Sequence, residues 1–131
     1  MDWLAWAREA VGTLTMTSTS TDTAWLALFT TGGTYQDPVT GTTDDLASVY
    51  AVTRASFPDW RMEVTATKGD ATGGVIEWVS HGHLPHGPEV VLHACSVITL
   101  TPTGRVATWR DYFDMGEFER QANRPAIPTT G

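Results

Sequence analysis

Apolar residues in the first half of the chain follow helical spacing, and polar runs divide them into three short helices. Asp2 occupies an N-cap position before the first helix, and the Thr/Ser-rich run at residues 15–23 ends it, because such side chains compete for backbone hydrogen bonds. A second helix is predicted at 23–29, ended by Gly32 and Gly33, and a third at 46–57. The expected inward stripes are Trp3, Trp6, Ala7, Ala10, Val11 and Leu14, then Trp25, Leu26 and Phe29, then Leu46, Val49, Tyr50 and Thr53.

Strand-like alternation replaces helical spacing in the second half of the chain. Turn-forming sequences rich in Gly and Pro separate the alternating segments from one another. A shorter strand, broken by Pro38, is expected at 34–39, and residues 40–45 are expected to form a turn. The four longer predicted strands are 61–67, 75–83, 89–100 and 105–113.

Helices followed by an antiparallel meander indicate an α+β fold, with the N-terminal helices packed on one face of a curved sheet. The 131 residues suit one domain, which we expect to span residues 1–121. Residues 122–131 are rich in Pro and Thr, and we expect them to form a loose tail.

The segment before the tail contains the most informative polar residue. Alternation places Asp111 on the same strand face as Trp109 and Phe113. If that apolar face is buried, the carboxylate is paired, protonated or functional, because an unpaired buried carboxylate is costly. The alternatives are a structural ion pair or an outward-facing side chain.

The run Trp109–Asp114, followed by Glu117-Phe118-Glu119, resembles the last strand and tail of the limonene epoxide hydrolase and SnoaL-like branch of the NTF2-like superfamily. The resemblance implies a cone-shaped α+β fold. It also implies that Asp111 is a catalytic carboxylate, since the matching aspartate in the epoxide hydrolases is one of two.

Asp37 is the second candidate. Tyr35 and Asp37 share a face of the short strand, although an Asp before a Pro also commonly begins a turn. Asp37-Pro38-Val39, followed by Gly41, resembles the segment in which ketosteroid isomerases and pyran cyclases of polyether pathways have their general base. In limonene epoxide hydrolases the same segment supplies a Tyr and an Asn that hold the nucleophilic water, and Tyr35 and Asp37 match them.

His81 is the third candidate, with an exposed histidine at a strand end as the alternative. Aligning its strand with the epoxide hydrolase pattern puts Val79 at the catalytic arginine and His81 at the base aspartate. The resemblance thus predicts a His81–Asp111 pair, in which the carboxylate would fix the imidazole tautomer. Without the arginine, hydrolysis by the family's mechanism is not expected.

Three further residues, together with Tyr35, are expected to contact substrate. Ser96 falls at the position of the protonated aspartate of ketosteroid isomerases, and a hydroxyl is a weaker donor, so steroid isomerisation is not expected. Trp60 and Trp109, with Trp78, are expected to line an apolar pocket, although an aromatic-rich core has the same pattern.

Composition narrows the classes of partner. Eight basic and 15 acidic residues give a net charge of −7, and the basic residues do not cluster, which disfavours nucleic acid and anionic membranes. Zinc-site spacing and phosphate-binding glycine motifs are missing, so we predict neither a metal nor a cofactor. The single cysteine, Cys95, cannot form an internal disulfide, and no basic leader begins the sequence, so we expect a cytoplasmic protein.

Two classes of function remain open. The first is an acid–base enzyme without a cofactor, acting on a small apolar oxygenated molecule as a cyclase, an isomerase or an altered epoxide hydrolase. The second is a non-catalytic binding or dimerisation module. Both faces of the strand at 89–100 are substantially apolar, which predicts a homodimer through the outer face of the sheet.

Overall fold

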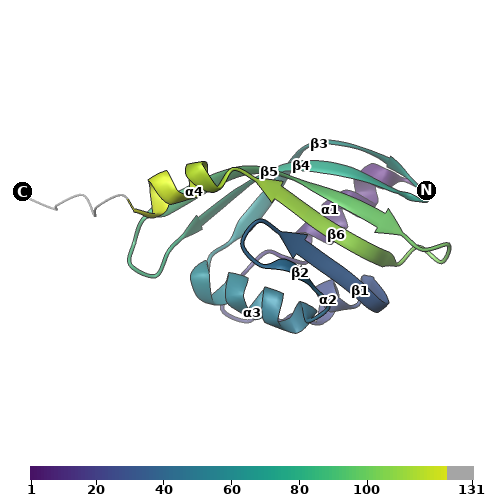
Figure 1. The fold of residues 1–131 in the computed structure, drawn as a ribbon, viewed down its shortest axis with the longest axis horizontal. Helices are drawn as coiled ribbons and strands as arrows, with labels where there is room; N and C mark the ends of the chain where they lie inside the picture. The colour runs from purple at the N-terminus through teal and green to yellow at the C-terminus, as the bar shows by residue number, and fades with distance from the viewer. Residues whose placement is uncertain (124–131) are drawn as a thin grey trace, which may run out of the picture.

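The computed structural model describes residues 1–123, and its arrangement confirms the α+β expectation. A curved six-stranded sheet has the order β2-β1-β6-β5-β4-β3, with α3 on one side of it and α4 near the turn between β4 and β5 (Figure 1). The expected tail at 122–131 lies outside the described residues except for Ala122 and Asn123, which end the last helix. The helices are α1 (Trp3–Gly12), α2 (Thr23–Leu26), α3 (Leu46–Ser56) and α4 (Met115–Ala122), and the strands are β1 (Phe29–Asp37), β2 (Gly41–Thr43), β3 (Arg61–Asp70), β4 (Gly73–His83), β5 (Glu89–Leu100) and β6 (Val106–Phe113).

The helices begin as the sequence predicts. The Asp2 carboxylate accepts a hydrogen bond from the Ala5 amide, and the Asp45 carboxylate accepts one from Ser48, so each aspartate caps a helix N-terminus. No helix among residues 1–123 is both long and apolar enough to cross a membrane.

The sheet is mixed, which corrects the expected all-antiparallel arrangement. Strands β3 to β6 form the predicted antiparallel meander, but β1 lies beside β6 and runs parallel to it. Gly32 and Gly33 do not end a helix as predicted. They lie inside β1, where the register with β6 shifts, and a Cβ on Gly33 would come within 2.9 Å of the Val106 carbonyl oxygen. The strand β2 was predicted as a turn, and it pairs with β1.

The inner face of the sheet carries the core and the outer face is more exposed. Ile76, Trp78 and Ser80 alternate inward on β4, and on β6 Trp109 and Asp111 are both buried. The predicted shared face of Trp109 and Asp111 is therefore confirmed.

Helix α4 was not predicted, and it covers the edge of β5 that extends beyond the end of β6. The side-chain amide of Gln121 accepts a hydrogen bond from the Val91 amide and donates one to the Val91 carbonyl, both at 2.7 Å. A Glu117 carboxylate oxygen accepts from the His93 amide at 3.1 Å. These side chains replace the missing strand neighbour and hold α4 over one end of the sheet.

Candidate active site

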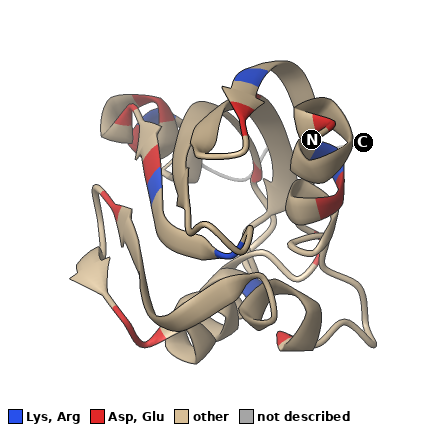
Figure 2. Ribbon diagram, turned by 90° about the vertical axis from the view of Figure 1, so that its right-hand side faces the viewer, with Lys and Arg blue, Asp and Glu red and all other residues tan. Residues whose placement is uncertain are grey.

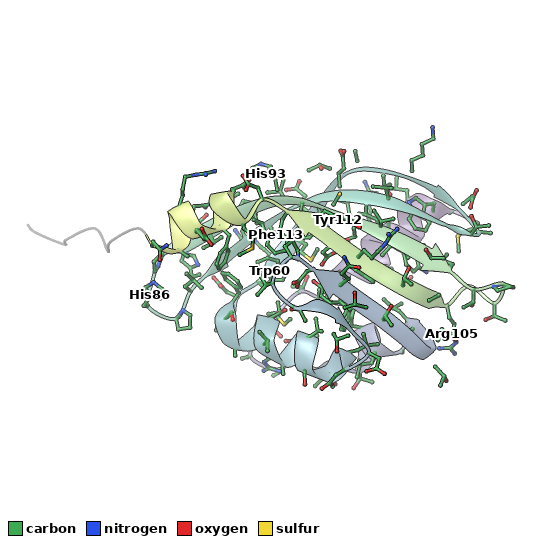
Figure 3. All side chains as sticks on the ribbon, viewed as in Figure 1. Trp60, His86, His93, Arg105, Tyr112 and Phe113 are labelled. Atoms are coloured by element: carbon green, nitrogen blue, oxygen red, sulfur yellow. The ribbon has the colours of Figure 1, made fainter. Side chains whose placement is uncertain are left out.

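A cavity of about 430 Å³ lies between the inner face of the sheet, α3 and α4. Figure 3 shows two of its wall residues, Trp60 and Phe113, between the sheet and α3. Most of the wall is aromatic or aliphatic, and the polar groups come chiefly from β1, β6 and the start of α3. The lining residues are Leu14, Trp25, Tyr35, Asp37, Val39, Thr40, Thr43, Asp45, Ser48, Val49, Val52, Thr53, Ser56, Phe57, Trp60, Met62, Trp78, Leu84, Leu92, Asp111, Phe113, Met115 and Phe118.

The parallel pairing of β1 with β6 brings two carboxyl groups to the same part of this cavity. Gln36 pairs with Arg110, so the next residues along the two strands are Asp37 and Asp111. The hydroxyl of Tyr35 lies 2.9 Å from Oδ2 of Asp37 and 2.7 Å from Oδ2 of Asp111. The side chains of Asp37, Tyr35 and Asp111 thus form one hydrogen-bonded chain, called the acid chain below.

Buried donors occupy the other oxygen of Asp111. Its Oδ1 accepts hydrogen bonds from Ser96 Oγ at 2.5 Å and from Trp109 Nε1 at 2.8 Å. Ser96 faces Asp111 across the β5–β6 ladder and itself accepts a hydrogen bond from Trp78 Nε1 at 2.9 Å. The carboxyl group is therefore held in one orientation, with Oδ2 directed at Tyr35.

Burial dominates the electrostatics of the site. Loss of solvent raises the pKa of Asp111 to about 6, although the donors Ser96, Tyr35 and Trp109 each act to lower it, and the nearby charge of Asp37 raises it further. Burial, together with the two neighbouring carboxylates, raises the pKa of the Tyr35 phenol well above its ordinary value. Near neutral pH the acid chain therefore contains a protonated phenol, Tyr35, and a carboxyl group, Asp111, whose pKa lies close to that pH.

Asp37 holds a turn and also belongs to the acid chain. Its Oδ1 accepts the amides of Val39 and Thr40 at 2.8 and 2.6 Å, as a turn-forming aspartate does. Its Oδ2 accepts from the Thr40 hydroxyl at 3.3 Å and lies within reach of Tyr35. The turn-forming role of Asp37 is therefore confirmed, and the same side chain also lines the cavity.

His81 does not meet Asp111, so the expected pair is wrong. Ile76, Trp78 and Ser80 occupy the inner face of β4, and alternation therefore places His81 on the outer face. There its Nδ1 lies 3.8 Å from a carboxylate oxygen of Glu89, and it does not line the cavity. The alignment of this strand with the epoxide hydrolase pattern is therefore wrong.

The four residues expected to contact substrate separate into two pairs. Tyr35 and Trp60 line the cavity. Ser96 and Trp109 are fully buried and lie behind Asp111, where they hold its carboxyl group instead of lining the wall. Their predicted direct contact with substrate is therefore replaced by a positioning role.

Helix α4, which was not predicted, adds Met115 and Phe118 to the wall. The signal was present: Asp114 is followed three residues later by Glu117, the spacing of a helix start, and the Asp114 carboxylate accepts a hydrogen bond from the Gly116 amide. Residues on α3 that face the cavity, such as Val49 and Thr53, had been predicted only as a core stripe.

The cavity wall contains three carboxyl groups and, among residues 1–123, no Lys, Arg or His. Figure 2 shows the basic residues scattered over the ribbon rather than gathered on one side. Within the same residues, no group of three or more His, Cys, Asp or Glu side chains is arranged to hold a metal ion. The Asp45 carboxylate caps α3 through Ser48, and the hydrogen bonds from Ser48 lower the pKa of Asp45.

Solved structures with the same fold share low sequence identity with this chain. A Catenulispora acidiphila protein with a ketosteroid isomerase-like fold, solved with trimethylamine, has a TM-score of 0.78 and 20% identity over 93% of this chain and 96% of that one. A putative SnoaL-like polyketide cyclase from Jannaschia has a TM-score of 0.68 and 16% identity over 79% of each chain. An epoxide hydrolase/cyclase-like enzyme of pyran ring formation in the polyether salinomycin has a TM-score of 0.67 and 14% identity over 88% and 89%.

Among curated proteins, none matches the chain. The sequence profile of the SnoaL-like domain matches residues 4–109, which run from α1 to the first half of β6. The profile and the structural neighbours agree with the resemblance found at the last strand. The chain belongs to the SnoaL-like domain family.

Proposed function

We propose that the protein is an acid–base enzyme that converts a small, mostly apolar, oxygenated molecule, as a SnoaL-like cyclase or isomerase. The observation that carries the proposal is Asp111, a carboxyl group only 8% exposed, in the wall of an apolar cavity and linked through Tyr35 to Asp37. Two carboxyl groups in different surroundings can divide the roles of acid and base. Together they supply both proton transfers, so these reactions need no cofactor.

In a cyclisation, the two acids act at opposite ends of the reaction. Asp37 takes the proton from a substrate hydroxyl as its oxygen attacks an epoxide carbon, and Asp111 gives its proton to the epoxide oxygen as that carbon–oxygen bond breaks. In an isomerisation, Asp37 removes a proton next to a carbonyl while Asp111 donates a hydrogen bond to the carbonyl oxygen, and Asp37 then returns that proton to a different carbon as the carbonyl re-forms. The neighbour that acts in pyran ring formation has this fold, which supports the cyclase form of the proposal.

Epoxide hydrolysis with an altered site is the alternative reaction. Water would replace the substrate hydroxyl as the nucleophile, and Tyr35 and Asp37 are placed to hold it. The cavity wall offers no cation among the described residues to hold two carboxylates ionised side by side. Attack by a hydroxyl of the substrate itself therefore suits the site better than attack by water.

The charges of the wall restrict the substrate. Asp37, Asp45 and Asp111 face a cavity without a basic residue in the described part of the chain, so a carboxylate or phosphate would meet only like charge. The volume of about 430 Å³ falls in the range of small-molecule sites. The substrate is therefore neutral or cationic.

A ligand panel tests this restriction. We expect neutral polycyclic ketones and epoxides to bind at least about 10-fold more tightly at pH 8 than matched analogues bearing a carboxylate. Quenching of tryptophan fluorescence measures binding, because Trp25, Trp60 and Trp78 line the cavity. In Asp37→Asn, which removes one negative charge from the wall, the difference in affinity between neutral ligands and carboxylate analogues should be smaller. Equal affinity for the anionic analogues would count against the proposed site.

A non-catalytic binding module is the second candidate function. Aromatic walls combined with carboxylates also suit an organic cation, and the neighbour from Catenulispora acidiphila was solved with trimethylamine. Binding of amines without turnover of any neutral compound in the panel would favour this candidate over the enzyme.

We propose further that two copies of the chain pair through the outer face of the sheet. Val75 and Tyr112 on this face are 39% and 44% exposed, and Val97 on β5, which pairs with Val75, is only partly buried. Sedimentation at micromolar concentration should give twice the mass of one chain, and Tyr112→Asp should halve it. Leu4→Asp, on α1, is the control. A single-chain mass for the unaltered protein would contradict the dimer.

A cytoplasmic location is part of the same proposal. Cys95 is a half-buried free thiol on the outer face of β5, which suits a reducing compartment.

A further inference from the structure

The hydroxyl of Tyr35 lies between two carboxyl oxygens, Oδ2 of Asp37 at 2.9 Å and Oδ2 of Asp111 at 2.7 Å. A phenol carries one hydrogen and can donate to only one of them at a time. The second short contact needs a hydrogen from the carboxyl group itself, since otherwise two lone pairs would face each other in a buried site.

The surrounding donors decide where that hydrogen lies. Trp78 donates to Ser96, so the hydroxyl hydrogen of Ser96 points to Oδ1 of Asp111, which also accepts from Trp109. With two donors on Oδ1, a proton on Asp111 belongs on Oδ2, facing Tyr35. The phenol then accepts from Asp111 and directs its own hydrogen at Asp37.

We propose that Asp111, Tyr35 and Asp37 form a proton relay in which the two carboxyl groups share one acidic proton through the phenol. In the forward transfer, the Oδ2–H bond of Asp111 breaks as a new bond to the Tyr35 oxygen forms. The original O–H bond of Tyr35 breaks as one to Oδ2 of Asp37 forms. One proton moves from one carboxyl group to the other, and Tyr35 is a neutral phenol before and after.

The relay gives the proposed chemistry a way to reset, and this consequence rests on the proposed function. After a cyclisation, Asp37 holds the proton of the substrate hydroxyl and Asp111 has lost its own. Reverse transfer through Tyr35 returns the proton to Asp111 and restores both groups for the next turnover. The site then needs no exchange with bulk water, which suits an apolar cavity.

Few other ionisable groups act on the relay. Asp45, at the start of α3, faces the same cavity, and its carboxylate is bonded to Ser48. Cys95 lies on the opposite face of β5, and its thiol pKa is raised by burial and then by the charges of Asp111 and Glu77. No Lys, Arg or His within residues 1–123 lines the cavity, so no cationic side chain there favours full ionisation of the two carboxyl groups.

The test is a carbon-13 NMR titration of the aspartate carboxyl groups between pH 3 and 9, without substrate. Shared protonation predicts that the Asp37 and Asp111 resonances each move in the same two steps. In Tyr35→Phe the phenol bridge is lost and only the direct charge interaction between the two carboxyl groups remains, so the separation between the two steps should shrink. Ser96→Ala is the matched control, because it removes a donor from Asp111 but leaves the phenol bridge, and it should keep both steps.

Independent single-step curves in the unaltered protein would overturn the relay, and so would a separation between the two steps that is unchanged in Tyr35→Phe. Asp37→Asn provides a second route if the phenylalanine variant does not fold, since Asp111 should then titrate in one step. None of these results depends on turnover, so failure of the relay is distinguishable from failure of the proposed enzyme.

A kinetic arm separates the relay from a structural role for Tyr35. In Tyr35→Phe we expect kcat to fall by at least about 10-fold and then to rise with imidazole concentration, as an external proton carrier replaces the relay. The unaltered enzyme should be indifferent to imidazole. A loss of activity in the variant that imidazole does not restore would contradict the relay.

Discussion

Replacement of Asp111 by asparagine is expected to lower kcat by about 10²- to 10⁴-fold while leaving the fold intact, the range found for a positioned acid. The amide oxygen of the new side chain can accept from Ser96 and Trp109, and its NH₂ can donate to Tyr35, so every hydrogen bond of the protonated carboxyl group survives. Only the transferable proton is lost. Turnover of a substrate from the neutral panel, with circular dichroism as the check on folding, measures the effect.

Two further variants calibrate this result. Asp37→Asn should cause a loss of similar size, since it removes the base and one end of the acid chain. Asp70→Asn is the control, because Asp70 bonds to Thr72 at the end of β3 and does not line the cavity, and its kcat should match the unaltered enzyme. Full activity in both Asp111→Asn and Asp37→Asn would rule out the proposed function.

The second large effect concerns stability. Asp111 binds its proton more tightly in the folded state, where its pKa is about 6, than in the unfolded chain, where it is near 3.8. Between these values the folded state holds more protons, so stability falls as pH rises. This contribution is complete below about pH 4 and is lost as pH passes through about 6. Its full size is about 3 kcal/mol, from about 1.4 kcal/mol per pKa unit.

Comparison with Asp111→Asn isolates this contribution. Asp45, Asp59 and Asp70 have lowered pKa values and lose stability as pH falls, but they are present in both proteins and cancel in the difference. Urea unfolding should show the variant to be about 3 kcal/mol more stable at pH 8, with no advantage at pH 4. A difference in the free energy of unfolding that does not change with pH would contradict a raised pKa for Asp111.

Much of the fold was accessible from periodicity alone. The three N-terminal helices lie within a few residues of their predicted bounds, and β5 matches its prediction at both ends. What periodicity cannot supply is the neighbour of an isolated strand. The parallel contact of β1 with β6 joins segments far apart in the chain, and only this contact brings Asp37 beside Asp111.

In the candidate site too, alternation within one strand was a reliable guide, whereas contacts between separate segments were not. Alternation correctly placed Asp111 inward with Trp109. The same rule applied to Ile76 and Trp78 points His81 outward, whereas the register taken from the resemblance crosses loops whose lengths the strand pattern does not fix. Ser96 and Trp109 were chosen as substrate contacts because sequence cannot distinguish a side chain that lines a cavity from one that supports its wall.

The most direct test of the proposed function is an NMR titration of the Asp111 carboxyl carbon in the free protein. A buried acid that keeps its proton close to neutral pH should have the midpoint of its larger titration step near pH 6, and the signal should be absent in Asp111→Asn. A midpoint near 4, the value of an ordinary solvated aspartate, would mean that the carboxyl group is not the acid proposed here.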